Sequence, residues 1–175
     1  MSSFEWPEFF RTARRQALHL EMRDVYAVAD EAEEFALWQR TGEADTDPDS
    51  EGWRSWTGIV RNAVARGVTV RRARIVSEPV SAYTRWLHTI TGTNLAAGEL
   101  VSWLPRSRAS DLCLPGNDFW VLDDHTVLFN LWTGEGDLAD PATELRHEPE
   151  VVKMCAAAFE AVWERATRHE EYQVR

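Results

Sequence analysis

Three arginines lie close together in a segment that otherwise has the pattern of a β-strand. Arg71, Arg72 and Arg74 occur in GVTVRRARIVSEP, between Gly67 and Pro79. The planar guanidinium group can hold a carboxylate or a phosphate through two hydrogen bonds at once. A guanidinium that is buried without such a partner costs several kcal/mol. The segment is therefore a candidate anion site if its side chains enter a partly closed cleft.

The alternation of side chains along this strand leaves three interpretations open. Val68 and Val70 share a face with Arg72 and Arg74, so neither face is purely apolar. A β-bulge would shift the phase and turn the arginines to solvent, whereas an edge position would let them discourage pairing with other chains. In the third interpretation they point into a cleft and meet carboxylates or an anionic ligand. The candidate carboxylates are Glu78, Glu99, Asp118, Asp123 and Asp124.

A second group of residues could supply proton transfer. Asp123, Asp124 and His125 form the acid–histidine cluster of the chain, and such groups can act as general acid or base. A polar hairpin turn explains the same three residues without chemistry. Asp118 precedes an apolar strand, so it either starts that strand or belongs to a site. Together with an arginine clamp, these groups would suit an enzyme for a phosphate- or carboxylate-bearing substrate.

Other signatures of chemistry are missing from the sequence. The five histidines have no metal-helix spacing, and there is no dinucleotide, phosphate-loop or nucleophile-turn motif. Aspartates alternate in the acidic loop 42–52, which lacks the glycine and the glutamate of a calcium loop and is expected to be flexible. Cys113 and Cys155 lie far apart, and Cys155 fits the apolar face of a helix. We expect no metal and no cofactor.

Charge is unevenly distributed along the chain. The net charge is -10, yet residues 53–109 contain nine arginines and two glutamates, a net of +7 that leaves -17 for the rest. This basic segment either attracts the acidic flanks or forms an anion-binding face. Nucleic-acid binding is a weaker alternative, because the overall charge repels phosphates. The sequence has neither a membrane-spanning apolar run nor a secretion signal, which predicts a cytoplasmic protein.

Periodicity predicts one α/β or α+β domain over residues 1–175. Helical patterns cover 6–17, 30–41, 53–66, 79–91 and 150–169. Ser77 is expected to cap the helix over 79–91. Strands are expected at 18–23, 68–76, 99–104, 118–122 and 126–132, and the last two form a hairpin. Because these two are apolar at successive positions, we expect a mixed sheet of about five strands with helices on both faces. Residues 134–148 read as a turn-rich connection.

The order of several motifs resembles an actinobacterial family of unknown function. The motifs are ARRQALHLEMRDVY, GVTVRRARIVSEPVSAYTRW, NLAAGELVSWLPR and DFWVLDD, within Phe9 to Trp163. Members of this family are often encoded beside helix-turn-helix regulators, which implies a regulatory or accessory role but supplies no catalytic residues. The strand–helix–strand order also resembles half of a phospholipase D-like fold. The His-x-Lys signature of that superfamily is absent, so its activity is not implied.

We therefore favour a non-enzymatic cytoplasmic accessory protein that binds a partner protein, such as a helix-turn-helix regulator, or a small anionic ligand. The enzyme with an arginine clamp is the alternative, and nucleic-acid binding ranks below both. The candidate ligand-binding residues are Arg71, Arg72, Arg74, Glu78, Asp118, Asp123 and His125.

Overall fold

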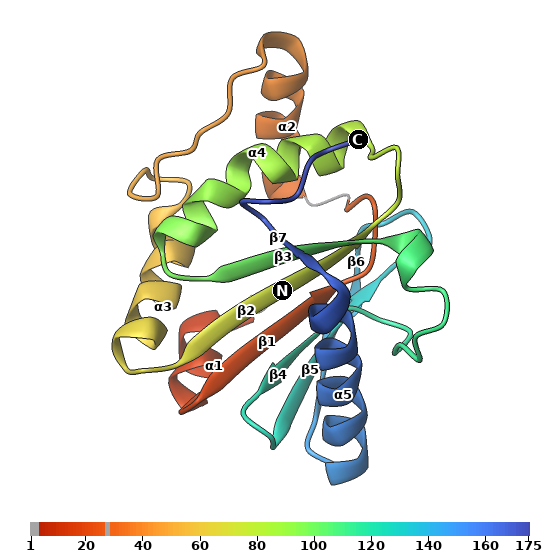
Figure 1. Cartoon of the computed structure of the whole chain (residues 1–175). Helices are drawn as coiled ribbons and strands as arrows, with labels where there is room; N and C mark the ends of the chain where they lie inside the picture. Colours follow the sequence, from red (N-terminus) through yellow and green to blue (C-terminus); the bar gives the residue numbers. More distant parts are fainter. Residues whose placement is uncertain (1–3, 27–28) are drawn as a thin grey trace.

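A seven-stranded mixed sheet forms the centre of the computed structural model, which describes residues 4–26 and 29–175 (Figure 1). The strands are β1 (Gln16–Glu21), β2 (Thr69–Val76), β3 (Leu100–Pro105), β4 (Phe119–Leu122), β5 (Thr126–Trp132), β6 (Leu138–Arg146) and β7 (Thr167–Arg168). Their order across the sheet is β6-β5-β4-β1-β2-β3-β7. The strands β1, β2 and β3 are parallel to one another, and all other neighbours are antiparallel.

Helices cover both faces of this sheet. They are α1 (Trp6–Thr12), α2 (Ala29–Thr41), α3 (Arg54–Ala65), α4 (Ala82–Ala96) and α5 (Pro149–Arg165), with a short 3-10 turn at Arg106–Arg108. Figure 1 shows α5 alone across one face and α1, α3 and α4 across the other, with α2 packed on α4. In the ranges described, every helix is too short or too polar to cross a membrane.

The prediction of a mixed sheet with helices on both faces is confirmed, but the number of strands is seven and not about five. The sequence reading missed β6 because Pro141 interrupts it and most of its side chains are exposed or half-buried. Proline is tolerated in a strand at the edge of a sheet, and β6 pairs only with β5. The other missed strand, β7, contains two residues directly after α5.

Regular alternation along β2 removes two of the three interpretations of the arginine segment. Its register with β1 and β3 is continuous, so there is no bulge, and its position between them excludes an edge strand. Val68 and Val70 pack with α3, whereas Ala73 and Ile75 pack on the opposite face with α5. The bulge and the edge position are therefore both wrong, and Arg72 and Arg74 are buried because helices also cover their face of the sheet.

Several boundaries also differ from the sequence prediction, and α1 ends at Thr12 although a helix over 6–17 was expected. The helix α4 begins after Ser81, whose Oγ accepts a hydrogen bond from the backbone N–H of Thr84, so Ser77 is not its cap. Ser77 instead donates to Asp24 through both its backbone N–H and its hydroxyl. The strand β1 lies two residues earlier than predicted, and as a result Glu21 is its last residue.

Candidate functional site

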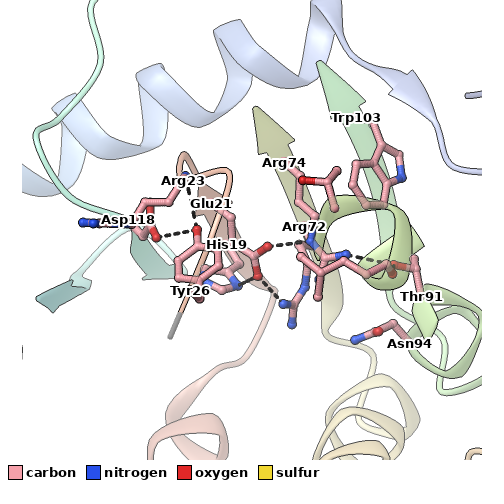
Figure 2. A network of polar contacts seen from close by, with 12 residues as sticks. His19, Glu21, Arg23, Tyr26, Arg72, Arg74, Thr91, Asn94, Trp103 and Asp118 are labelled. Carbon is pink, nitrogen blue, oxygen red and sulfur yellow. Dashed lines mark hydrogen bonds and ion pairs between the residues drawn. The ribbon is translucent and has the colours of Figure 1, made fainter. Parts of the chain in front are cut away.

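Arg72 and Arg74 are buried in the face of the sheet that α1, α3 and α4 cover, and one carboxylate forms ion pairs with both (Figure 2). Glu21, on the neighbouring strand β1, accepts a hydrogen bond from Arg72 Nη1 and another, 2.5 Å long, from Arg74 Nε. All three residues are less than a tenth exposed. Parallel pairing places Glu21 beside Arg74 and explains how residues about fifty positions apart meet.

Further partners complete this ion-pair network. Arg72 Nε donates to Glu99 over 2.7 Å, and Glu99 also accepts from Asn94 Nδ2. Arg74 Nη1 donates to the hydroxyl of Thr91, and its guanidinium lies 5.1 Å from the centre of the Trp103 ring. Two guanidinium groups therefore face two buried carboxylates, and their formal charges balance.

The ion pairs determine the protonation of Glu21. Burial alone raises the pKa of a carboxyl group, but the charges of Arg74 and Arg72 outweigh this effect and hold the pKa of Glu21 well below its usual range. Burial alone lowers the pKa of Arg72, but the charges of Glu99 and Glu21 outweigh this effect, so the pKa of Arg72 is raised. Glu21 and Arg72 are therefore both charged at neutral pH.

A cavity of about 130 Å³ adjoins this network. The sheet contributes one wall, and the connection after β1, together with α2 and α4, contributes the other. The lining residues are His19, Glu21, Tyr26, Glu31, Arg72, Arg74, Tyr83, Leu87, Asp118, Asn130 and Trp132. Charged, aromatic and amide side chains thus converge on one small space.

Two tyrosine–carboxylate pairs lie on the cavity wall. Tyr26 donates its hydroxyl to Asp118 over 2.6 Å, and Asp118 also accepts from the backbone N–H of Met22. Tyr83 donates to Glu31 in the same way. Burial raises the pKa of Asp118 to about 6 and also raises the pKa of Glu31. These carboxylates are far easier to protonate than Glu21, because burial raises their pKa and no arginine among residues 4–26 and 29–175 forms an ion pair with them.

Two buried polar atoms of the cavity lining lack a hydrogen-bond partner within the described residues. They are Nδ1 of His19 and Nε1 of Trp132. His19 stacks on Trp120 with ring centres 4.0 Å apart, and its Nδ1 lies 3.5 Å from Glu21 without forming a hydrogen bond. Burial and the charge of Arg72 hold the pKa of His19 well below its usual range, so the imidazole is neutral. Its Nε2 faces the amide donor Asn130 Nδ2 at 3.5 Å, so the ring proton lies on Nδ1, which can donate to a hydrogen-bond acceptor.

The structure brings only some of the predicted site residues together. Arg72, Arg74 and Asp118 line the cavity. Arg71 lies on the opposite face of the sheet, where it pairs with the half-exposed Glu160 of α5 at 3.0 and 2.5 Å. Glu78 is exposed and accepts a hydrogen bond from a tyrosine near the C-terminus. These two positions are therefore separate from the cavity.

The hairpin turn is also separate from the cavity. Asp123 accepts hydrogen bonds from the backbone N–H groups of Arg14, Arg15 and Gln16, at the start of β1, and His125 Nε2 lies 3.5 Å from its carboxylate. Asp118 and Asp123 flank opposite ends of β4. Asp123 and His125 therefore cannot act as acid or base beside Arg72 and Arg74, and their role is explained by the turn.

Sequence reasoning missed several cavity residues. Glu21 and His19 are the important ones, and the signal was the alternation of polar residues with Leu18 and Leu20 in β1. That pattern is typical of a strand with one exposed face, yet both faces of β1 are buried. The described residues contain no group of three or more side chains with the placement of a metal site.

Comparison with known proteins gives a family but no activity. A family model described as "Domain of unknown function (DUF6879)" matches residues 4–174. The chain belongs to this family. No curated protein matches the chain in sequence.

Several solved structures resemble this DUF6879 chain in fold, and each aligns with 93% of it. They include TrmBL2, an archaeal chromatin protein (14% identity, TM-score 0.49), the phospholipase D family member Nuc from Salmonella typhimurium (10%, 0.49) and NucT from Helicobacter pylori (9%, 0.50). The aligned part is 49% of TrmBL2, so the chain spans about half of that protein, and 87% of each of the other two. At these identities the likeness concerns the fold alone.

Proposed function

We propose that this protein is a non-enzymatic accessory protein that binds a small polar ligand in the cavity beside Arg72 and Arg74. The observation that carries the proposal is the pair of buried, unpartnered atoms in the lining, His19 Nδ1 and Trp132 Nε1. A buried polar group without a hydrogen bond costs about 1–3 kcal/mol. A polar ligand that bonds to both atoms removes this cost, and the gain appears as binding affinity.

The arrangement of charge favours a ligand-binding protein over the alternative hypothesis, an enzyme with an arginine clamp. That hypothesis needs free guanidinium groups for a phosphate and an acid or base beside them. Arg72 and Arg74 are instead balanced by Glu21 and Glu99, and the predicted acid–base residues lie at the far end of β4. Burial also withdraws both arginines from any contact with a nucleic-acid backbone. The same balance argues against a ligand that carries only negative charge.

The proposal extends to the setting of the protein. We propose a cytoplasmic, actinobacterial protein that works with a helix-turn-helix transcriptional regulator. Its support is the motif resemblance from Phe9 to Trp163, including GVTVRRARIVSEPVSAYTRW. Affinity capture of the tagged protein from its host tests this part, and failure to enrich such a regulator would reject it.

Ligand binding is tested by native mass spectrometry of the purified protein after equilibration with a small-molecule extract of host cells. Leu87 lines the cavity and is apolar, so Leu87→Phe fills space without changing any charge. The exposed Leu145 provides the matched control, Leu145→Phe. We expect a bound mass on the wild type and the control, but none on Leu87→Phe. A wild type without bound mass, or equal retention by Leu87→Phe, rejects the proposal.

A further inference from the structure

We propose that the ligand is a small zwitterion of the amino-acid class, bound with its ammonium group toward Asp118 and Glu31 and its carboxylate toward Arg72 and Arg74. This inference rests on the proposed ligand-binding function and names the chemistry of the ligand. It follows from the size of the cavity, from the groups on each of its sides and from the balance of their charges.

The volume limits the ligand to a few atoms. A cavity of about 150 Å³ in a protein core accommodates benzene, which has about six non-hydrogen atoms. The cavity here measures about 130 Å³ and therefore suits a molecule of similar or slightly smaller size. Glycine and alanine fall in this range and serine is only slightly larger, whereas a nucleotide or a sugar phosphate could be enclosed only in part.

One side of the cavity is suited to an ammonium group. Asp118 and Glu31 supply carboxylates that form no ion pair with an arginine in the described part of the chain. Three aromatic rings stand beside them, with the centre of Tyr26 4.9 Å from that of Trp132 and 6.2 Å from that of Tyr83. Ring faces attract cations, and the attraction is stronger where water is excluded. The unpartnered Nδ1 of neutral His19 carries the ring proton, since Nε2 accepts from Asn130 Nδ2, so it belongs with the donors for the ligand carboxylate.

The two arginines offer donors for a carboxylate. In the chain as described, the side-chain hydrogen bonds of Arg72 and Arg74 come from Nε and Nη1, so each has an Nη2 group left to donate. Trp132 Nε1 is a further unpartnered donor in the lining. Two such donors and an indole N–H match the two oxygens of a carboxylate.

Charge balance excludes the two simpler ligand classes. The lining contains the carboxylates Glu21, Glu31 and Asp118 against the guanidinium groups Arg72 and Arg74. A simple anion would add negative charge beside unneutralised carboxylates. A simple amine would leave the arginine and tryptophan donors unpaired. A zwitterion adds no net charge and pairs with both sets of groups.

The experiment is isothermal titration of the full chain with alanine and with two compounds that each lack one of its charged groups. Propionate lacks the ammonium group, and ethylamine lacks the carboxylate. We expect alanine, or the related glycine or serine, to bind at least about tenfold more tightly than either, since about 1.4 kcal/mol corresponds to tenfold in affinity. Asp118→Asn should weaken this binding by a similar factor, whereas Glu160→Gln, on the opposite face, should not change it.

Two results overturn the inference. One is the absence of measurable binding of glycine, alanine and serine, and the other is binding of propionate or ethylamine as tight as that of alanine. Neither result affects the proposed function, which is decided separately by the mass retained from the extract and lost in Leu87→Phe. A retained mass that is not an amino acid would reject the zwitterion and leave the binding function standing.

Discussion

Replacement of Glu21 by glutamine removes the charge that joins Arg72 to Arg74 and nearly preserves the size of the side chain. The effect on each arginine differs. Arg72 retains its ion pair with Glu99, whereas Arg74 retains only the Thr91 hydroxyl and the Trp103 ring. The variant therefore contains one buried guanidinium without a carboxylate, in a place where Glu21, Arg72 and Arg74 are each less than a tenth exposed.

The expected loss is large for a domain of ordinary stability. Breaking one partner of a buried ion pair costs about 3–5 kcal/mol, because the remaining charge is left uncompensated. The glutamine oxygen still accepts one hydrogen bond, so we expect about 3 kcal/mol for Glu21→Gln. The corresponding change at the half-exposed partner of Arg71, Glu160→Gln, should cost about 0–1 kcal/mol.

Urea denaturation followed by circular dichroism at neutral pH measures both variants. The double variant Glu21→Gln/Arg74→Met removes both charges of one pair, and its loss should be smaller than the sum of the two single losses by about 0.5–3 kcal/mol. A Glu21→Gln variant that unfolds with the same free energy as Glu160→Gln would refute the network as a determinant of stability. Because the pKa of Glu21 is lowered in the folded state, the wild-type advantage is present above the unfolded carboxyl value of about 4.3 and declines below it.

Three further predictions concern other parts of the chain. Burial raises the pKa of Asp118 to about 6, so the stability of the wild type relative to Asp118→Asn should be highest below about pH 4 and decline as the pH rises through 6, as measured by urea titrations at several pH values. Ser81→Ala removes the N-cap of α4 and should cost about 1 kcal/mol in the free energy of unfolding, while the exposed Ser55→Ala should change it by less than about 0.5 kcal/mol. Cys155 is fully buried and burial raises its pKa to about 11, so a thiol reagent should label only Cys113 in the native protein and both cysteines in urea; labelling of both without urea would contradict the packing around α5.

Local patterns in the sequence were sufficient for the strands and helices with strong periodicity. The hairpin of β4 and β5 follows from two apolar runs around a polar turn, and the structure confirms it. Asp123 lies in that turn as expected, whereas the bonds of its carboxylate to backbone N–H groups at the start of β1 are tertiary contacts outside the local pattern. By contrast, β6 has a proline and few apolar positions, so its pairing with β5 depends on tertiary contacts that a local pattern does not contain.

The candidate site was predictable only in part, for a similar reason. The arginines of β2 indicated that carboxylates were needed, and Glu99 was among the candidates. Glu21 was not, because its polar alternation with Leu20 in β1 reads as solvent exposure when the strand is considered alone. The pairing of β1 with β2 and the covering helices turn that face into the interior. Which polar residues become buried is thus decided by the packing of distant segments.

The two ends of the sheet have a consequence for the behaviour of the protein at high concentration. An unpaired strand edge is a template on which a second chain can add its own strand and begin to aggregate. At one end, β6 contains Pro141, which has no N–H to offer, and at the other end β7 is only two residues long. Neither end provides a long, regular row of hydrogen-bonding groups, so this fold is protected from growth into fibres by the same irregular strands that made its edges hard to predict.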